Sequence, residues 1–162
     1  MVQIGLYFCL HSCEYTKTNS HRRTTQFCLR DMKFQYTGGT IPFDSPESCF
    51  LQALVVTLFL NTQKNSVRGE SISMENTCLP SGCPVMACAR HFLHLRDHDS
   101  DLNTTMCVYF ERKGAEGKSV TTSHLVALLR LWTSKIGYDR LGFHPHKIGS
   151  HSLCSGGART LR

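Results

Sequence analysis

Residues 50–77 read FLQALVVTLFLNTQKNSVRGESISMENT, and this stretch carries the strongest fold signal in the 162-residue sequence. The apolar run FLQALVVTLFL could be a buried strand, or a helix that begins after the segment SPE at 45–47. Its second half is rich in β-branched and aromatic residues, and the polar turn NTQKNS and the alternating stretch ESISMENT follow it. The sequence therefore predicts a β-hairpin with strands at 54–60 and 69–75.

Elements on either side of the hairpin predict a mixed α/β (α+β) domain. The stretch FCLRDMKFQY at 27–36 places its apolar side chains largely on one side, which indicates a third, half-buried strand closed by Gly38 and Gly39. Helical spacing, an N-terminal proline or capping residues predict helices at 2–13, 83–96, 122–137 and 152–162. We expect these helices to pack on a small antiparallel three-stranded sheet, within one domain that covers residues 1–162.

The helix at 122–137 has the clearest amphipathic pattern in the chain. Thr121, Thr122 and Ser123 offer it an N-cap. Its apolar residues recur at helical spacing, and we expect them to form a buried stripe of Leu125, Leu128, Leu129, Trp132 and Ile136.

Composition places the chain among globular, intracellular proteins. Apolar residues make up 41% and charged residues 19%, and no run of eighteen apolar residues predicts a membrane span. The apolar stretch at 4–10 follows no Lys or Arg and leads to no small-residue cleavage site, so a buried helix is favoured over a signal peptide. The nine cysteines are odd in number and scattered, which favours a reducing nuclear or cytoplasmic location over a disulfide framework.

The positive charge is concentrated in the last quarter of the chain. The net charge is +6, and residues 121–162 hold six Lys or Arg against one acidic residue. This imbalance favours an anionic partner, with double-stranded DNA as the expectation, although a solvated basic face without a partner would give the same count. The candidate DNA contacts are Arg130, Lys135, Arg140, Lys147 and Arg159.

Two ligand-site patterns are weak matches. The segment GAEGKS at 114–119 resembles a phosphate-binding loop, but Arg112 stands where that loop needs its first glycine, so a turn is predicted. A two-cysteine, two-histidine zinc site is an alternative, because the chemistry of its four candidate ligands suits tetrahedral zinc. Those candidates are Cys78, Cys83, His94 and His98, and their spacing departs from the usual one.

Cys154 and His151 raise the question of a thiol nucleophile with its base. A thiolate near a helix N-terminus has a lowered pKa. However, the two residues lie three apart and no neighbouring side chain is placed to orient the imidazole, so cysteine hydrolysis is disfavoured.

Four stretches in order resemble the catalytic domain of tyrosine recombinases, of the divergent, phage-integrase-like type carried by eukaryotic mobile elements. They are LYFCLHSCEYTKT at 6–18, VVTLFLNTQKN at 55–65, CPV at 83–85 and LGFHPHKIGSHSLCSGGA at 141–158. The last contains the pattern I-G-x-H-S-L-x-S-G-G-A, which is the most specific of the four. The resemblance implies DNA recombination and integration, with no cofactor and with other recombinase protomers as further partners.

In that family a tyrosine attacks a DNA phosphodiester, while two arginines, a lysine and a histidine stabilise the phosphorane. Position by position, the resemblance places the lysine on Lys64 and the histidine on His151, both of which are present. It places the two arginines on His11 and Cys154, so both guanidinium groups are replaced. Planar, permanently charged guanidinium groups supply much of the electrostatic stabilisation of such a phosphorane.

The resemblance also implies which parts of the family's architecture the sequence lacks. None of the five tyrosines stands where the resemblance expects the nucleophile. Because the resemblance begins near the first residue, at position 6, we also expect the N-terminal clamp domain to be missing. We expect a partial, marginally stable catalytic core, with apolar surface exposed near Leu153 and Leu161, that binds DNA without cleaving it alone. An active strand-transfer enzyme completed in trans, or by a missing exon, is the alternative, and a zinc-dependent interaction module is another.

Overall fold

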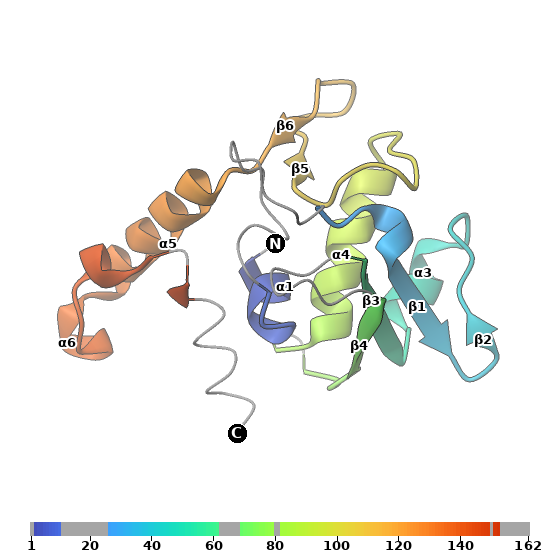
Figure 1. Ribbon diagram of the computed structural model, residues 1–162, viewed down its shortest axis with the longest axis horizontal. Helices are drawn as coiled ribbons and strands as arrows, with labels where there is room; N and C mark the ends of the chain where they lie inside the picture. Colours follow the sequence, from blue (N-terminus) through green and yellow to red (C-terminus); the bar gives the residue numbers. More distant parts are fainter. Residues whose placement is uncertain (1, 11–25, 62–68, 80–81, 150, 153–162) are drawn as a thin grey trace.

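The computed structural model describes residues 2–10, 26–61, 69–79, 82–149 and 151–152 (Figure 1). Helices and consecutive pairs of antiparallel strands follow one another along the chain, which confirms the expected mixed α/β class. The helices are α1 (Val2–Tyr7), α3 (Glu47–Leu51), α4 (Pro84–Arg96), α5 (Thr122–Ile136) and α6 (Tyr138–Leu141), with 3-10 turns η1 (Leu29–Asp31) and η2 (Pro145–Lys147). The strands are β1 (Met32–Tyr36), β2 (Gly39–Thr40), β3 (Val55–Leu60), β4 (Glu70–Glu75), β5 (Val108–Tyr109) and β6 (Lys118–Ser119).

The predicted hairpin forms the centre of the main sheet. β3 and β4 pair antiparallel from Val55 opposite Glu75 to Leu60 opposite Glu70, which confirms the hairpin. β1 pairs with the other edge of β3, and the strand order is β2-β1-β3-β4. The sheet therefore has four strands where three were predicted, because the chain turns back at Gly39, whose φ of +124° suits glycine, to add the short strand β2.

The strand predicted at 27–36 is shorter in the structure. Its first residues form the 3-10 turn η1, in which the Asp31 carboxylate accepts a hydrogen bond from the Cys28 N–H at 2.8 Å. Arg30 and Leu29 donate their backbone N–H groups to Leu102 and Thr104. This segment is therefore bound to the loop after α4 instead of to a neighbouring strand of the main sheet.

The apolar run at 50–60 is divided between a helix and a strand. α3 begins directly after Pro46 and ends at Leu51, and β3 begins at Val55. Between them the Asn76 amide donates to the Ala53 carbonyl at 2.9 Å, and the Leu54 N–H donates to the Gln35 carbonyl at 2.8 Å. The run is therefore helical at its beginning, up to Leu51, and extended from Val55 onward, so each interpretation holds for one part of it.

α4 packs across the sheet and holds the core together. It begins at Pro84, one residue after the predicted start, and its N-cap is Cys83, whose sulfur accepts the Met86 N–H. The Phe92 ring contacts the rings of Phe34 and Phe50, with centroids 5.3 Å and 4.9 Å apart. α1 and α3 both pack against α4, so the core lies between α4, these two helices and the sheet.

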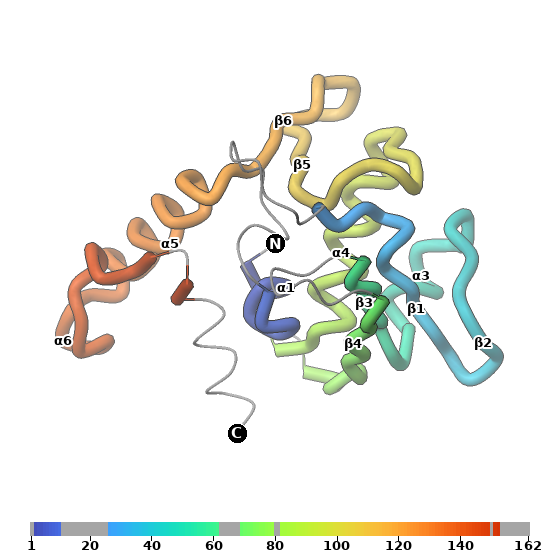
Figure 2. The backbone as a smooth tube through the Cα atoms, viewed as in Figure 1, coloured from blue at the N-terminus to red at the C-terminus, as the bar shows by residue number. Residues whose placement is uncertain are grey.

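α5 extends away from this core (Figures 1 and 2). It forms the predicted helix, and the Thr121 side chain caps it by accepting the His124 N–H at 3.2 Å. The predicted buried stripe is wrong, because Leu125 is its only member that is buried, whereas Trp132 is 61% and Ile136 46% exposed. Leu129 is half-buried and still packs against the core, but the helix then leaves the body of the molecule, so Trp132 and Ile136 do not reach the core.

Two of the predicted helices extend into parts of the chain outside the described residues. α1 covers the beginning of the predicted helix 2–13, and Cys9, with φ of +50°, lies beyond its end. Of the helix predicted at 152–162, only Ser152 is described, and Leu153 and Leu161 lie outside. Among the helices that the structure describes, none has the length and apolar composition to cross a membrane.

Candidate nucleic-acid interface

The four positions that the resemblance assigns to catalysis lie mostly outside the described residues. His11, Lys64 and Cys154 are in this group, and only His151 is described, as an exposed residue after η2. Lys64 belongs to the connection between β3 and β4, where a hairpin lysine is expected. Their arrangement as a common site therefore stays a prediction.

The candidate DNA contacts, by contrast, gather on one described part of the molecule. We call α5, α6, η2 and the residues that connect them, 122–149, the basic arm. In Figure 2 the chain runs out along α5, turns at α6 and comes back to η2 beside α5. Lys135, Arg140 and Lys147 are exposed on this arm, and Arg159 lies outside the described residues. Asp139 is the single acidic residue that follows Val120 in the sequence.

Arg130 has a structural role within the basic arm. Its Nε and Nη2 atoms donate to the Ile148 carbonyl at 3.0 Å and 2.9 Å, and Nη2 also donates to the His146 carbonyl at 3.2 Å. Ile148 is buried, with 8% of its surface exposed. Arg130 thus fixes the returning segment to α5, a role that its place in the sequence did not indicate.

Three aromatic rings form a column on the same arm. The Tyr138 and His144 rings stack with centroids 4.4 Å apart, and the His144 and His146 rings stack with centroids 5.5 Å apart. All three residues are exposed. This column was not predicted from the sequence, although the aromatic residues around Gly142 and Pro145 in the segment YDRLGFHPH are a signal from which it could have been found.

An apolar hollow of about 460 Å³ lies at the base of the basic arm. It is lined by Val2, Tyr109, Val120, His124, Leu125 and Leu128. Leu128, which is 45% exposed, belongs both to this lining and to the exposed apolar face of α5.

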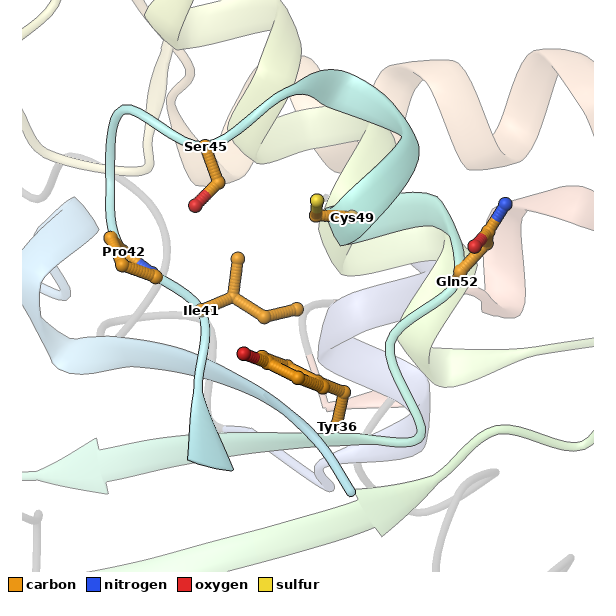
Figure 3. Close-up of a pocket in the computed structure, with 6 residues that line it drawn as sticks. All are labelled: Tyr36, Ile41, Pro42, Ser45, Cys49 and Gln52. Atoms are coloured by element: carbon orange, nitrogen blue, oxygen red, sulfur yellow. The ribbon is translucent and has the colours of Figure 1, made fainter. Parts of the chain in front are cut away.

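A smaller hollow of about 210 Å³ lies beside α3 (Figure 3). The side chains around it are Tyr36, Ile41, Pro42, Ser45, Cys49 and Gln52. None of these lining residues is basic, so this hollow is not suited to phosphate. In Figure 1, α3 and α5 lie at opposite ends of the molecule, which separates it from the basic arm.

The zinc alternative is wrong for the four residues proposed as ligands. Cys83 caps the start of α4, while His94 and His98 lie at and beyond its end, about 16 Å away along the helix axis. The His98 Nδ1 lies 2.7 Å from the His94 carbonyl oxygen and donates to it. Within the described ranges, no three His, Cys, Asp or Glu residues are grouped so that they could hold a metal ion.

The segment at 114–119 begins as the predicted turn and ends in the short strand β6, which was not predicted. Gly114 has φ of +75°, and the Ala115 N–H donates to the Arg112 carbonyl at 3.1 Å. The Lys118 ammonium lies 2.8 Å from the Glu111 carboxylate, so it is paired within the turn. No phosphate cradle forms from these residues.

The groups with shifted pKa values include His91 on α4 and Cys83 at its N-cap. Loss of water around the His91 ring lowers its pKa from 6.5 to about 4, and its Nε2 lies 2.7 Å from the Met106 carbonyl oxygen. Burial alone would raise the pKa of the Cys83 thiol, but hydrogen bonds from Met86 and Thr77 outweigh burial and lower that pKa. Both groups lie in the packed body of the molecule and not on the basic arm.

Comparisons with protein-family models, with curated proteins and with solved structures give no significant match to this chain.

Proposed function

We propose that this chain is a DNA-binding remnant of a tyrosine recombinase, which binds double-stranded DNA through the basic arm. The observation that carries the proposal is the collection of exposed cations on α5, α6 and η2, with Asp139 as the one acidic residue in that stretch. Lys and Arg contacts to phosphates supply most of the affinity of sequence-independent DNA binding. The surface charge of the arm is therefore of the kind that a duplex attracts.

The shape of the basic arm supports the same function. A 15-residue helix such as α5 is about 22 Å long, so it can follow about two thirds of a turn of B-DNA. Because the arm stands away from the core, a duplex can approach it without contact with the sheet (Figure 1). Arg130 keeps η2 beside α5, which holds Lys147 on the same arm as Lys135.

We further propose that the chain does not cleave DNA alone. The proposal rests on His11 and Cys154, which stand where the resemblance expects the two arginines. A neutral thiol cannot form two hydrogen bonds to a phosphorane, and removal of one preorganised donor costs about 10²- to 10³-fold in rate. Replacement of both arginines therefore leaves little transition-state stabilisation.

A nuclear or cytoplasmic location belongs to the same proposal. Six of the described cysteines are free thiols, namely Cys28, Cys49, Cys78, Cys83, Cys88 and Cys107. A reducing compartment keeps thiols in this form, and it is also where DNA is found in a cell.

A charge-neutralisation experiment on the basic arm would test DNA binding. The test variant is Lys135→Gln/Arg140→Gln/Lys147→Gln, and the control is Arg90→Gln/Arg112→Gln/Lys113→Gln, which removes the same number of exposed charges elsewhere. Fluorescence anisotropy with a labelled duplex at 50 mM salt should show a loss of about tenfold per lost phosphate contact for the arm variant. Equal losses for both variants would show that net charge alone, and not the arm, attracts the duplex.

Active strand transfer is the second candidate, because Lys64 and His151 are present at the positions that the resemblance assigns to them. A nicked suicide substrate would trap any covalent protein–DNA link, which denaturing electrophoresis would show as a shifted band. We expect no such band. A band that is lost when one particular tyrosine is changed to Phe would establish the enzyme instead.

A further inference from the structure

The column of Tyr138, His144 and His146 is unusual because it is ordered without being part of the core. None of the three rings belongs to the buried cluster around α4, and Tyr138 is 52% exposed. Stacking of the rings at interplanar angles of 22° and 16° therefore orders them on the surface. Core packing does not account for this arrangement.

The backbone beneath the column is held by several constraints. Gly142 adopts φ of +71°, a left-handed conformation that ends α6 and directs the chain back toward α5. Pro145 then fixes its own φ at the start of η2. Arg130 binds the carbonyls of His146 and Ile148, so the segment that carries two of the three rings is tied to α5. The rings are thus positioned before any ligand arrives.

The column also has two ends that a further ring could cover. His144 lies between Tyr138 and His146, and among the described residues no other ring is stacked on the outer face of either end. Cations flank both ends in the sequence, since Arg140 follows Tyr138 by two residues and Lys147 follows His146 directly. A flat aromatic surface beside exposed cations is the arrangement by which proteins bind single-stranded nucleic acids.

We propose that the column of Tyr138, His144 and His146 is a stacking platform for unpaired bases of a DNA strand. The proposal rests on the proposed DNA-binding function of the basic arm, and it names a second form of DNA for that arm. Lys147 and Arg140 contact the phosphates, and one base stacks on each free end of the column. The bases of an intact duplex are already stacked on each other, so the platform acts on single strands, gaps and tails.

Base stacking and phosphate contacts contribute differently to the affinity for a single strand and to its salt dependence, so an experiment can separate them. Stacking of one base on an aromatic ring contributes about 5- to 150-fold to affinity and depends little on salt, whereas phosphate contacts set the salt dependence. The variants Tyr138→Leu and His146→Leu each remove an end ring and leave an aliphatic side chain in its place. Phe143→Leu is the matched control, because Phe143 is a partly exposed aromatic residue of the same segment that is not in the column.

Anisotropy would be measured with a labelled single strand of about 16 nucleotides and with a blunt duplex of the same sequence. We expect each column variant to lose about 5-fold or more in affinity for the single strand, with an unchanged salt slope and unchanged duplex binding. Circular dichroism would verify that each variant keeps its helix content.

The possible failures are distinguishable. If the column variants bind the single strand as tightly as the parent while the Lys135→Gln/Arg140→Gln/Lys147→Gln variant loses duplex binding, the platform is wrong and the function of the arm stands. If the parent binds neither form of DNA, both proposals fail. Tighter binding to a single-stranded RNA of the same sequence than to DNA would also overturn the platform as stated.

Discussion

His91 should make the stability of this protein depend on pH in a way that can be calculated. The ring is desolvated on α4, which lowers its pKa from 6.5 to about 4, and its Nε2–H donates to the Met106 carbonyl at 2.7 Å. The folded protein therefore keeps His91 neutral at pH 5, whereas the unfolded chain binds a proton there. Because the folded pKa is the lower one, stability is fully present above pH 6.5 and is lost as the pH falls toward 4.

The size of this effect follows from the two pKa values. Each unit of difference corresponds to about 1.4 kcal/mol, so the full loss is about 3 kcal/mol at pH values below 4. At pH 5 the unfolded state has gained most of its proton, and the loss relative to pH 7 is about 2 kcal/mol. A single domain is typically stable by only about 5–15 kcal/mol, so this loss is readily measured.

Urea unfolding followed by far-ultraviolet circular dichroism at pH 7 and pH 5 would measure the effect. The variant His91→Gln keeps a donor for the Met106 carbonyl but does not titrate. We expect the free energy of unfolding to fall by about 2 kcal/mol less in this variant than in the parent between the two pH values. His94, whose pKa is lowered by desolvation and by the charge of His98, is present in both proteins, so its own titration contributes to both. Identical pH dependence in the two proteins would refute the reasoning.

Further predictions concern the core, the helix cap and metal. Phe92→Ala should destabilise the fold by about 3–5 kcal/mol, because the Phe92 ring contacts the rings of Phe34, Phe50 and Phe43. Trp132→Ala, on the exposed face of α5, should lower the free energy of unfolding by less than about 1 kcal/mol. Thermal melts would compare the two variants. Cys83→Ala should lower the free energy of unfolding by about 1 kcal/mol more than Cys83→Ser, because serine can still accept a hydrogen bond from the Met86 N–H. Equal urea midpoints for the two variants would contradict this role of Cys83 as the helix cap. Excess chelator should leave the melting temperature unchanged, because the described residues form no metal site, and this includes Cys78, Cys83, His94 and His98. A fall in melting temperature on addition of chelator would support the zinc alternative instead.

The parts of the fold that depend on local sequence were predictable. The hairpin of β3 and β4 follows from strand composition and alternation with a polar turn between, and α4 follows from Pro84 and its apolar spacing. The division of the run at 50–60 was not predictable, because short apolar runs fit a strand and a helix equally well. The boundary between helix and strand is set by residues that are distant in sequence. Asn76 donates a hydrogen bond to the Ala53 carbonyl, and the Gln35 carbonyl accepts one from the Leu54 N–H.

The apolar face of α5 shows a second limit of prediction from sequence. Periodicity predicts that Leu128, Trp132 and Ile136 share a face, but it does not predict what covers that face, and in the structure they are exposed. For the candidate site, the sequence predicted the exposed cations of the basic arm. It did not predict that Arg130 binds the Ile148 carbonyl, because that contact depends on how the chain returns after α6.

The salt dependence of duplex binding tests the central proposal most directly. Plots of log K against log salt would be compared for the parent, the Lys135→Gln/Arg140→Gln/Lys147→Gln variant and the Arg90→Gln/Arg112→Gln/Lys113→Gln control. If the basic arm binds the DNA backbone, the arm variant should lose about 0.9 from the slope for each lost phosphate contact, and the control should keep the slope of the parent. A flat plot for the parent, or the same slope for all three proteins, would contradict DNA binding by the basic arm.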